Sequence, residues 1–386
     1  MTSDTLHTPE DTLILKRPGN TDRNLRAWDA ADEFLLEQVF AHLTEGAGER
    51  VLVVDDQFGA LTLGLRRFEP VTLADSASLA GALTLSGPAN GVSHVAVPES
   101  WLAPPQGPFD VIVMRIPRQL DYLSWLLRWS NDVLASDGVL IAGGMIKHLP
   151  DRSVEVFNDL VRTKQVCPAR KKARVVVCQR GDQGLGDWQG QWKGYSLGDG
   201  GPDVSGLPAV FARERLDIGT RLLLPDVHRA AAALPPGARV LDLACGNGVL
   251  GLEVLGAQPK LSVVFSDVSS QAVVSSKHNV ESAFSDVDVC FCHADGVPEN
   301  AGKFDLILLN PPFHEGGVVG DHIALRLFRQ AARHLAANGQ LLMVGNRHLG
   351  YHRSLKRYFP VVTQLQADPR FVVFSAHHQS LGAGRS

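Results

Sequence analysis

The fold is decided by the stretch Val240-Leu-Asp-Leu-Ala-Cys-Gly-Asn-Gly-Val-Leu-Gly251. An apolar strand leads into a glycine-rich loop and then a helix, the order found in Rossmann-like cofactor pockets. Gly246 and Gly248 allow a tight turn and a close approach of a ligand to the backbone, and we expect them to line the pocket together with Cys245. No Lys-Ser or Lys-Thr pair follows the glycines, which excludes a P-loop. Two spaced glycines alone leave a nicotinamide dinucleotide open.

Three aspartates stand at or near the ends of successive predicted strands. Asp242 precedes the glycine loop, where it could accept hydrogen bonds from loop amides or from a cofactor ammonium group. Asp267 follows the next strand at a spacing that suits a ribose diol. Asp295 follows the third strand, where a carboxylate commonly takes an adenine amino group. Each could simply cap a loop, but three carboxylates at one sheet edge favour a nucleoside-containing cofactor.

The segment Phe211–Thr220, which precedes a predicted helix, has two interpretations. Asp217 or Thr220 could cap that helix, since both residue types are preferred at the position before the first turn. Alternatively, the segment closes over the bound cofactor. On the second interpretation, Thr220 is a candidate cofactor contact.

The most specific signal is Asp305-Leu-Ile-Leu-Leu-Asn-Pro-Pro-Phe313. A strand ends at Asn310, and two prolines then fix the backbone, so the side-chain carbonyl of Asn310 and the backbone carbonyl of Pro311 can point the same way. Two such acceptors can hold both hydrogens of a conjugated NH2 group and turn its nitrogen toward an activated methyl group. Phe313 offers a face for stacking a flat base. The expected catalytic residues are Asn310, Pro311, Pro312 and Phe313.

The first half of the chain repeats the pattern of the second. The offset between matching segments grows along the chain, as expected for one fold copied with loops that changed length; two unrelated α/β domains remain the alternative. The matching pairs are 50–59 with 239–248, 109–114 with 304–309, and 137–144 with 338–345.

The first copy has lost the residues that carry the chemistry. Gln57 and Phe58 stand where the second half has a glycine and an asparagine, so their side chains would crowd a cofactor. The run Arg115-Ile-Pro-Arg118 replaces the Asn-Pro-Pro-Phe turn. We therefore predict an α/β protein of two tandem Rossmann-like domains, the first of them degenerate. The expected bounds are 1–180 for the degenerate domain, 181–206 for a Gly-, Asp- and Ser-rich linker, and 207–386 for the catalytic domain.

Composition agrees with two globular domains without a membrane span. The 386 residues are 45% hydrophobic and 20% charged, and no run of about 18 apolar residues occurs. No secretory signal is visible at the N-terminus. Five cysteines without CxxC spacing argue against a disulfide framework or a metal site and indicate the cytoplasm. Cys290 and Cys292 are expected to be buried structural thiols. Oligomeric state is not encoded visibly, and a monomer is our expectation.

Two stretches are locally basic although the net charge is −4. Neither 161–181 nor 322–367 contains an Asp or Glu, and the second interleaves basic with aromatic residues. Phosphate neutralisation with stacking explains that mixture, although a solvated charged surface is the alternative. The candidate RNA-binding residues are Arg170, Lys171, Lys172, Arg174, Arg347, Arg353, Lys356 and Arg357.

Taken together, these motifs resemble the bacterial ribosomal RNA guanine-N2 methyltransferases, and among them the large-subunit enzymes most. The resemblance covers both halves and is closest from about Phe211 to Phe374. It implies S-adenosylmethionine (SAM) as cofactor and the N2 amine of guanosine 1835 in 23S rRNA as target. It also implies that Gly246 and Gly248 line the SAM loop, that Asp267 holds the ribose, and that 310–313 form the site of the target amine.

Four alternatives stay open from the sequence. A 16S rRNA guanine-N2 methyltransferase would share the same motifs. Methylation of a protein glutamine at N5 or of adenine at N6 would use the same turn, but those enzymes usually carry Tyr where this chain has Phe313, and they lack the degenerate first half. A non-catalytic RNA-binding assembly factor would not be expected to keep the glycine loop and the Asn-Pro-Pro turn intact.

Overall fold

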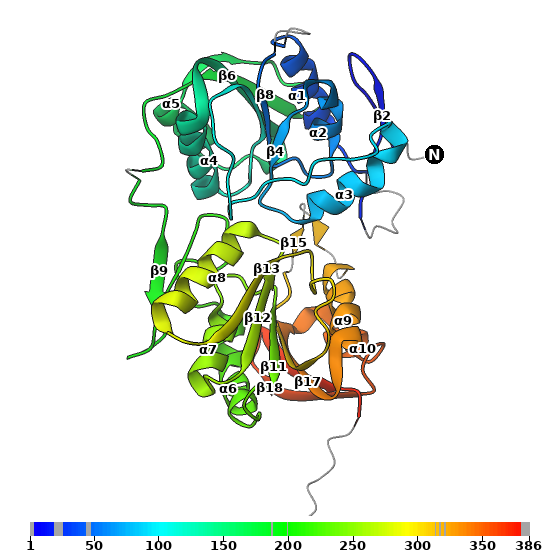
Figure 1. Cartoon of the computed structure of the whole chain (residues 1–386), viewed down its shortest axis with the longest axis vertical. Helices are drawn as coiled ribbons and strands as arrows, with labels where there is room; N and C mark the ends of the chain where they lie inside the picture. The colour runs from blue at the N-terminus through cyan, green and yellow to red at the C-terminus, as the bar shows by residue number, and fades with distance from the viewer. Residues whose placement is uncertain are drawn as a thin grey trace, which may run out of the picture. The chain divides into compact units, whose positions relative to one another are not determined.

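The computed structural model (Figure 1) describes residues 4–18, 26–43, 48–186, 188–198, 200–312, 314–315, 318–319 and 322–379. The chain forms two compact units, Met1–Gln191 and Trp192–Ser386. We refer to them as unit 1 and unit 2 and describe each by itself.

The core of unit 2 is a seven-stranded sheet in the order β13-β12-β11-β14-β17-β19-β18. The first five strands of this order are parallel, and β19 runs antiparallel to both of its neighbours. Apolar runs such as Val263–Phe265 are buried because helices cover both faces of the sheet. The strands are β11 (Arg239–Leu243), β12 (Ser262–Asp267), β13 (Asp288–His293), β14 (Phe304–Leu309), β17 (Leu335–Asn346), β18 (Val361–Ala367) and β19 (Phe371–His377).

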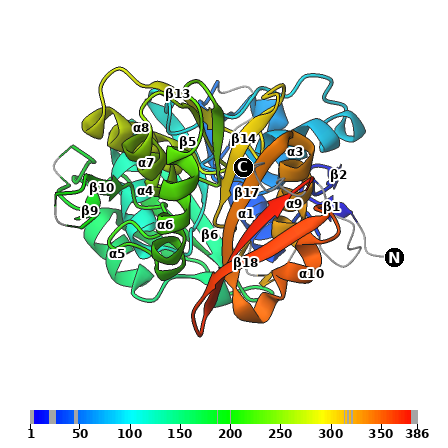
Figure 2. The same cartoon turned by 90° about the horizontal axis from the view of Figure 1, so that it is seen from below.

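Five helices cover the two faces of this sheet. Figure 2 shows α6, α7 and α8 on one side of the strands and α9 and α10 on the other. Each face has its own cluster of buried apolar side chains, one around Phe265 and the other around Phe328. The bounds are α6 (Ile218–Ala232), α7 (Val249–Ala257), α8 (Ser270–Ala283), α9 (His322–His334) and α10 (Tyr351–Leu355), with a short 3-10 helix η4 (Arg347–Leu349) and the short strands β15 (His314–Glu315) and β16 (Val318–Val319).

Unit 1 has a six-stranded sheet in the order β4-β3-β5-β6-β8-β7. This is the order of β12-β11-β14-β17-β19-β18 in unit 2. At the place of β13, the structure has a single parallel bridge between Leu73 and Glu99. The strands are β3 (Val51–Val54), β4 (Val71–Leu73), β5 (Phe109–Arg115), β6 (Leu134–Met145), β7 (Arg162–Val166) and β8 (Ala173–Gln179), and the helices are α1 (Ala30–Phe40), α2 (Ala60–Gly64), α3 (Ser78–Ser86), α4 (Leu120–Val133) and α5 (Ser153–Leu160), with the 3-10 helices η1 (Arg66–Phe68), η2 (Pro88–Asn90) and η3 (Ile146–His148).

The same side-chain contact also occurs within each of the two units. Arg50 stacks over Phe109 with its guanidinium carbon 4.7 Å from the ring centre, and Arg239 stacks over Phe304 at the same distance. The β5–β6 and β14–β17 pairs each shift register just after the phenylalanine. These coincidences confirm the repeat predicted from the sequence.

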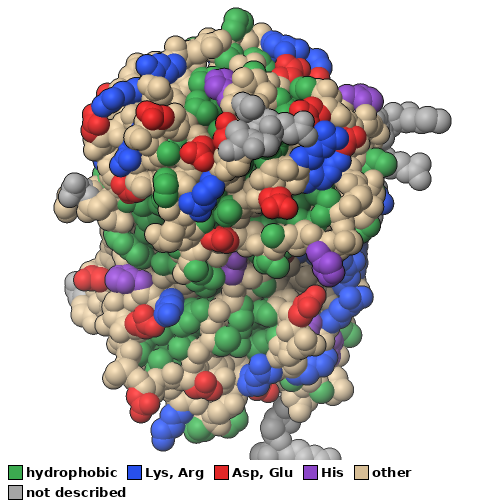
Figure 3. All heavy atoms as spheres, turned by 45° about the horizontal axis from the view of Figure 1, so that its top comes forward, with side chains coloured by type: hydrophobic (Ala, Val, Ile, Leu, Met, Phe, Trp, Pro, Cys, Tyr) green, Lys and Arg blue, Asp and Glu red, His purple; other side chains and the backbone are tan. Residues whose placement is uncertain are grey.

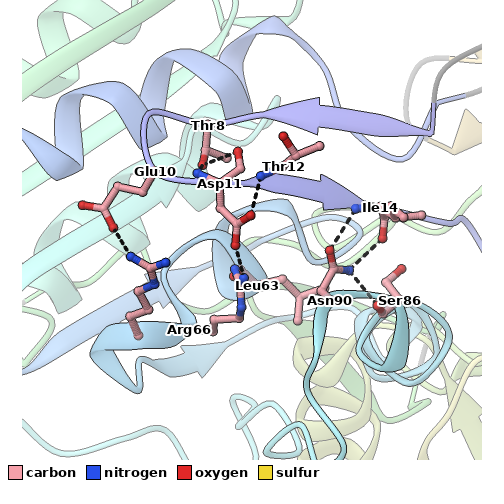
Figure 4. Close-up of polar contacts among 10 residues, drawn as sticks. Thr8, Glu10, Asp11, Thr12, Ile14, Leu63, Arg66, Ser86 and Asn90 are labelled. Carbon is pink, nitrogen blue, oxygen red and sulfur yellow. Dashed lines mark hydrogen bonds and ion pairs between the residues drawn. The ribbon is translucent and has the colours of Figure 1, made fainter.

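Strands β1 (Thr5–His7) and β2 (Thr12–Ile14) form an antiparallel hairpin that contacts Arg66 and Asn90 of unit 1 (Figure 4). The side-chain amide of Asn90 pairs with the backbone of Ile14 as a neighbouring strand would, accepting from its N–H at 2.9 Å and donating to its carbonyl at 2.8 Å. Asp11 forms an ion pair with Arg66. The hairpin thereby buries Leu6 and Leu13 completely in the core of unit 1.

The stretch 181–206, expected to be a linker, contains regular structure. Strands β9 (Lys193–Ser196) and β10 (Asp203–Gly206) form an antiparallel pair. Asn279 of α8 accepts from the backbone N–H of Ser205 at 3.0 Å and donates to its carbonyl at 2.7 Å. The hairpin therefore belongs to unit 2. The hairpin could not be predicted from its own glycine-rich sequence, because a side chain of the distant helix α8 holds it in place.

The prediction that Cys290 and Cys292 are buried is wrong. Cys290 is exposed and Cys292 is half-buried, with their sulfur atoms 3.7 Å apart. Both point to the same side of β13, since strand side chains alternate. β13 is the edge strand of the sheet and is incompletely covered.

Candidate functional site

A cavity of about 320 Å³ opens at the carboxyl ends of β11, β12 and β14 in unit 2. This is the position at which parallel α/β sheets bind ligands. Of the predicted site residues, the structure brings Thr220, Cys245, Gly246, Asp267, Asn310, Pro311 and Pro312 together there. The other lining residues are Tyr195, Ala209, Val210, Phe211, Ala212, Leu216, Asp217, Ala244, Asn247, Val249, Leu250, Val268, Ser269 and Ala272.

The glycine loop is tied to the carboxylate that ends β12. The backbone N–H of Gly246 donates to Asp267 Oδ2 at 2.8 Å, and the N–H of Ser269 donates to Oδ1 at 2.9 Å. Gly246 has φ +56°, and a Cβ added to it would meet no atom within 4 Å. Its backbone thus borders open space in the cavity, next to a carboxylate held in one orientation. This arrangement fits a ligand that carries a ribose diol.

Gly248 has a different role from Gly246. It has φ +84° at the start of α7, and a Cβ there would come within 2.9 Å of the Ser276 side chain. The glycine is required by the turn and by the close packing of α7 on α8. It does not line the cavity, whereas Cys245 does, and burial raises the pKa of the Cys245 thiol well above its usual value.

Asp242 is fully buried and does not line the cavity. Its Oδ2 accepts from the backbone N–H of Gly251 in the first turn of α7 at 2.9 Å. Within the described part of the chain, Oδ1 has no hydrogen-bond partner. Burial raises the pKa of this carboxyl to about 8. Of the two roles considered for Asp242, the structure shows the bond to a loop or helix amide, and contact with a cofactor stays a prediction.

Asp295 is engaged by a neighbouring arginine. Its Oδ1 pairs with Arg326 of α9 at 2.6 Å, and its backbone carbonyl accepts from the same guanidinium at 2.9 Å. It does not line the cavity. The structure gives no support to the predicted contact with an adenine amino group, which stays a prediction.

The side-chain amide of Asn310 is fixed by the start of α6. Its Nδ2 donates to Thr220 Oγ1 at 2.9 Å and lies 3.3 Å from Asp217 Oδ2. Pro311 is buried and Pro312 is exposed, and both line the cavity. Phe313, the fourth predicted catalytic residue, lies outside the described residues.

The capping interpretation of the segment before α6 is confirmed, and closure of the segment over a bound cofactor stays a prediction. Asp217 caps the helix, since its Oδ2 accepts from the N–H of Thr220 at 2.9 Å. The same segment forms one wall of the cavity, in which Phe211 is 61% exposed and Ala212 has φ +53°.

The sequence did not reveal how this wall is held. Three buried polar side chains of α8, each one turn from the next, bind the backbone of 205–209. Gln271 accepts from Ala209 N at 2.8 Å, and Ser275 accepts from Leu207 N at 3.0 Å. Asn279 binds Ser205, as described above. A polar stripe spaced by four residues on an otherwise buried helix face is the signal that could have predicted it.

At the corresponding strand end and helix start, unit 1 has an ionic cluster, which we name the Arg115 cluster; Arg115 and Asp32 are buried, and Asp29 is half-buried. It comprises Arg115, Asp29 and Asp32. Arg115 is 6% exposed and contacts Asp29 at 2.8 and 2.9 Å and Asp32 at 3.0 Å. Burial raises the pKa of Asp32 to about 7. Asp29 caps α1 as Asp217 caps α6, so the scaffold is kept while the polar turn is replaced by charge.

In the folded unit 1, acidic side chains from elsewhere in the chain lie beside the basic stretch 161–181. Arg170 forms an ion pair with Glu37 of α1, and Lys171 pairs with Glu33 at 2.8 Å. The absence of acids between residues 161 and 181 therefore does not create an acid-free surface, because α1 brings acids from elsewhere in the chain. Lys172 and Arg174 have no ion pair within the described ranges.

In the basic stretch of unit 2, more of the cations are exposed and without an ion pair among the described residues. Arg347 donates to the backbone carbonyl of Asp368 at 2.7 Å. Arg353, Lys356 and Arg357 are exposed and form no ion pair with another described residue. On the face shown in Figure 3, basic and acidic side chains are interspersed.

No group of three or more His, Cys, Asp or Glu side chains among the described residues is placed to hold a metal ion. None of the described helices combines the length and apolar character that a membrane crossing requires.

Family models match both units. The model of the RLMG N-terminal domain matches residues 3–182, and the model of the methyltransferase small domain matches residues 202–375. The chain is also similar over its whole length to curated proteins named ribosomal RNA large subunit methyltransferase G. That of Alcanivorax borkumensis is 37% identical, over 95% of each chain. That of Pseudomonas putida KT2440 is 38% identical, over 96% of this chain and 99% of the relative.

A solved structure has the same fold in both units. It is that of the T. thermophilus 16S rRNA N2 G1207 methyltransferase RsmC in complex with AdoMet and guanosine, with a TM-score of 0.74 and 23% identity over 97% of each chain. At this identity the similarity shows the fold alone. The relatives that are more than a third identical over nearly the whole chain show the family. This chain belongs to the ribosomal RNA large subunit methyltransferase G family, RlmG.

Proposed function

We propose that this protein transfers the methyl group of SAM to the exocyclic N2 amine of a guanosine in 23S rRNA, at position 1835. The observation that carries the proposal is the placement of Asn310 and Pro311 in one cavity with Gly246 and Asp267. The names of the relatives support the substrate, and the guanosine and AdoMet bound by RsmC support the chemistry.

The cavity has the chemical character that SAM requires. When bound, SAM supplies an electrophilic methyl group on a sulfonium sulfur. Asp267 would accept the ribose hydroxyls, because its carboxylate is already oriented by two backbone amides. Gly246 would let the cofactor lie against the backbone. Val249 and Leu250 add apolar walls.

The Asn310-Pro311 turn would align the target amine. The N2 nitrogen of guanine is a poor nucleophile, because its lone pair is delocalised into the ring. Asn310 Oδ1 and the Pro311 carbonyl would accept its two hydrogens and favour the pyramidal nitrogen that develops during transfer. This is alignment and electrostatic stabilisation without a strong general base.

The RNA would meet unit 2 on the surface of Arg353, Lys356 and Arg357, where exposed cations can contact phosphates. We place the reaction in the cytoplasm, where ribosomal RNA is found. The proposal needs no metal, and it requires only a monomer, since all residues invoked lie in unit 2.

The test separates cofactor binding from transfer. Gly246→Asp places a carboxylate in the space that the cofactor would occupy, so SAM binding measured by calorimetry should be lost. Asn310→Ala should keep the dissociation constant for SAM within about threefold while lowering kcat on 23S rRNA about 10²–10³-fold, as loss of an oriented polar group does. Near-normal turnover by Asn310→Ala would refute the amine-orientation mechanism.

The substrate is tested separately. Nucleoside mass spectrometry of 16S and 23S rRNA from cells lacking the protein should show loss of N2-methylguanosine from the 23S pool. Loss from the 16S pool would name the small-subunit substrate. No loss from either pool would redirect the search to adenine or to a protein glutamine.

A further inference from the structure

We infer that Asp217 and Thr220 are positioning residues, which hold the side-chain amide of Asn310 with its oxygen toward the substrate. The inference rests on the proposed transfer to an amine and assigns a second task to the start of α6. The two ends of the Asn310 amide group have nearly the same shape but differ in chemistry, since one donates and the other accepts hydrogen bonds.

The nitrogen end of the Asn310 amide is the end that is held. Nδ2 has two hydrogens and no acceptor capacity, and it lies 2.9 Å from Thr220 Oγ1 and 3.3 Å from Asp217 Oδ2. An ionised carboxylate only accepts hydrogen bonds, so the oxygen end of the amide would be repelled there. The contacts therefore dictate that Oδ1 is the end left for a ligand. Among the described residues, Oδ1 has no hydrogen-bond partner.

The two holding residues are themselves fixed. Asp217 Oδ2 accepts from Thr220 N at 2.9 Å and from Thr220 Oγ1 at 3.3 Å. The Thr220 hydroxyl thus donates to Asp217 and accepts from Asn310. Gly219 lies between them, and a Cβ there would approach Phe371 Cδ1 to 3.0 Å and Asp217 Oδ2 to 3.1 Å. Phe371 packs against the helix start, so the cap cannot easily withdraw from the strand end.

The chemical consequence concerns the direction of a hydrogen bond. The target is an NH2 group, which must donate to the turn. An Asn310 side chain rotated by 180° would present its own NH2 group to that amine and would repel it. Without the two holding contacts, both orientations become accessible, and part of the bound enzyme is unproductive. Thr220 then acts on the reaction through Asn310.

Unit 1 shows which part of this arrangement is general. Asp29 caps α1 and contacts Arg115 at the end of β5, as Asp217 caps α6 and contacts Asn310 after β14. The bond from helix start to strand end is therefore a property of the repeated fold. Only unit 2 combines it with a strand-end residue that has an acceptor to spare.

The main variant is Thr220→Val, which removes the hydroxyl at nearly constant shape. We expect kcat at saturating SAM and RNA to fall about 10–100-fold, on the order of the loss of one oriented polar contact. The dissociation constant for SAM should change less than about threefold, and Thr220→Ser should recover most of the lost rate. The matched control is Thr363→Val, the same substitution at an exposed position of β18 far along the chain.

A double-mutant cycle separates positioning from a structural role. In an Asn310→Ala background, Thr220→Val should cause little further loss of kcat, because there is no amide left to orient. Additive losses would overturn the inference. So would a weaker SAM affinity with unchanged kcat, since Thr220 would then be a cofactor contact only.

A second variant covers the possibility that a hydrophobic side chain at 220 disturbs the helix. Asp217→Ser keeps a good N-cap residue but is too short to retain the contact with Asn310. It should lower kcat with little change in thermal stability, and full activity would overturn the role of Asp217. Failure of wild-type protein to methylate any RNA is a different result, which would count against the proposed function itself.

Discussion

At the scale of single residues, Asp242 is the most unusual group near the site. It is the second-to-last residue of β11 and is fully buried; one carboxylate oxygen accepts from a backbone amide, and the other has no partner within the described residues. A buried charge without a partner is costly, so the neutral acid is favoured and the pKa rises to about 8. Unit 2 therefore carries a proton that its unfolded chain loses near pH 4.

This proton predicts a pH dependence of stability. Below about pH 4 both states are protonated, and between pH 4 and 8 only the folded state is, so the free energy of unfolding contributed by Asp242 falls as pH rises. The slope is about 1.4 kcal/mol per pH unit for one proton. Asp242→Asn should lack this slope. Hydrogen exchange of the β11 and β12 amides, compared between wild type and variant from about pH 5 to 7, would measure it; parallel pH profiles would exclude a protonated Asp242.

Residue types were predictable where a backbone requirement or a motif fixes them. Gly246, Asp267 and Asn310 could be placed at the cavity because each follows a strand whose end is visible in the sequence. Asp295 and Gly248 could not be told apart from true lining residues. Their neighbours, Arg326 and Ser276, come from helices whose approach only the tertiary fold defines.

At the scale of elements, the main strands were predictable from apolar runs, and their occurrence in both units was predictable from the repeat. The order of the strands in each sheet comes from the structure alone. Elements that side chains of other elements hold in place were not predictable. The β9–β10 hairpin was hidden because its backbone bonds to Asn279 of α8, and the wall at 207–209 because it bonds to Gln271 and Ser275. No local pattern in the glycine-rich stretch encodes these partners.

The N-terminal hairpin gives a test at this scale. Asn90→Ala removes both bonds to Ile14 and one to the Ser86 carbonyl, leaving backbone groups unpaired. We expect β2 to lose about 0.5–1.5 kcal/mol of local stability, seen as faster hydrogen exchange at Thr12–Ile14, because water can reach the freed groups. Asn158→Ala, at an exposed position of α5, is the matched control. Unchanged protection of β2 would mean that burial of Leu6 and Leu13 alone anchors the hairpin.

At the scale of the whole molecule, charge must be counted after folding. No acidic residue stands near Arg170 and Lys171 in the sequence, yet in the structure Glu37 and Glu33 of α1 form ion pairs with them. A sequence window cannot see such pairing, since the partners are more than a hundred positions apart. The prediction of two tandem domains was more secure, because it rested on a repeat that spans the chain.

We expect RNA affinity to depend most on the cations that form no ion pair among the described residues. Lys356→Gln with Arg357→Gln should weaken binding to a 23S rRNA fragment and lower the slope of log affinity against log salt by about 1–2, one ion released per lost phosphate contact. Arg170→Gln with Lys171→Gln should have a smaller effect, because those charges are already neutralised. Anisotropy titrations over a range of salt would compare them. Equal effects of the two pairs, or none from the first, would move the RNA interface elsewhere.

The Arg115 cluster limits which single substitutions unit 1 tolerates at the end of β5. Exchange of Arg115 for asparagine would leave the buried carboxylate of Asp32 without its cation, at a cost of about 3–5 kcal/mol. The half-buried Asp29 would lose less, because water can reach its carboxylate. An Asn-Pro-Pro turn at this strand end would therefore suit unit 1 only if α1 changed together with β5.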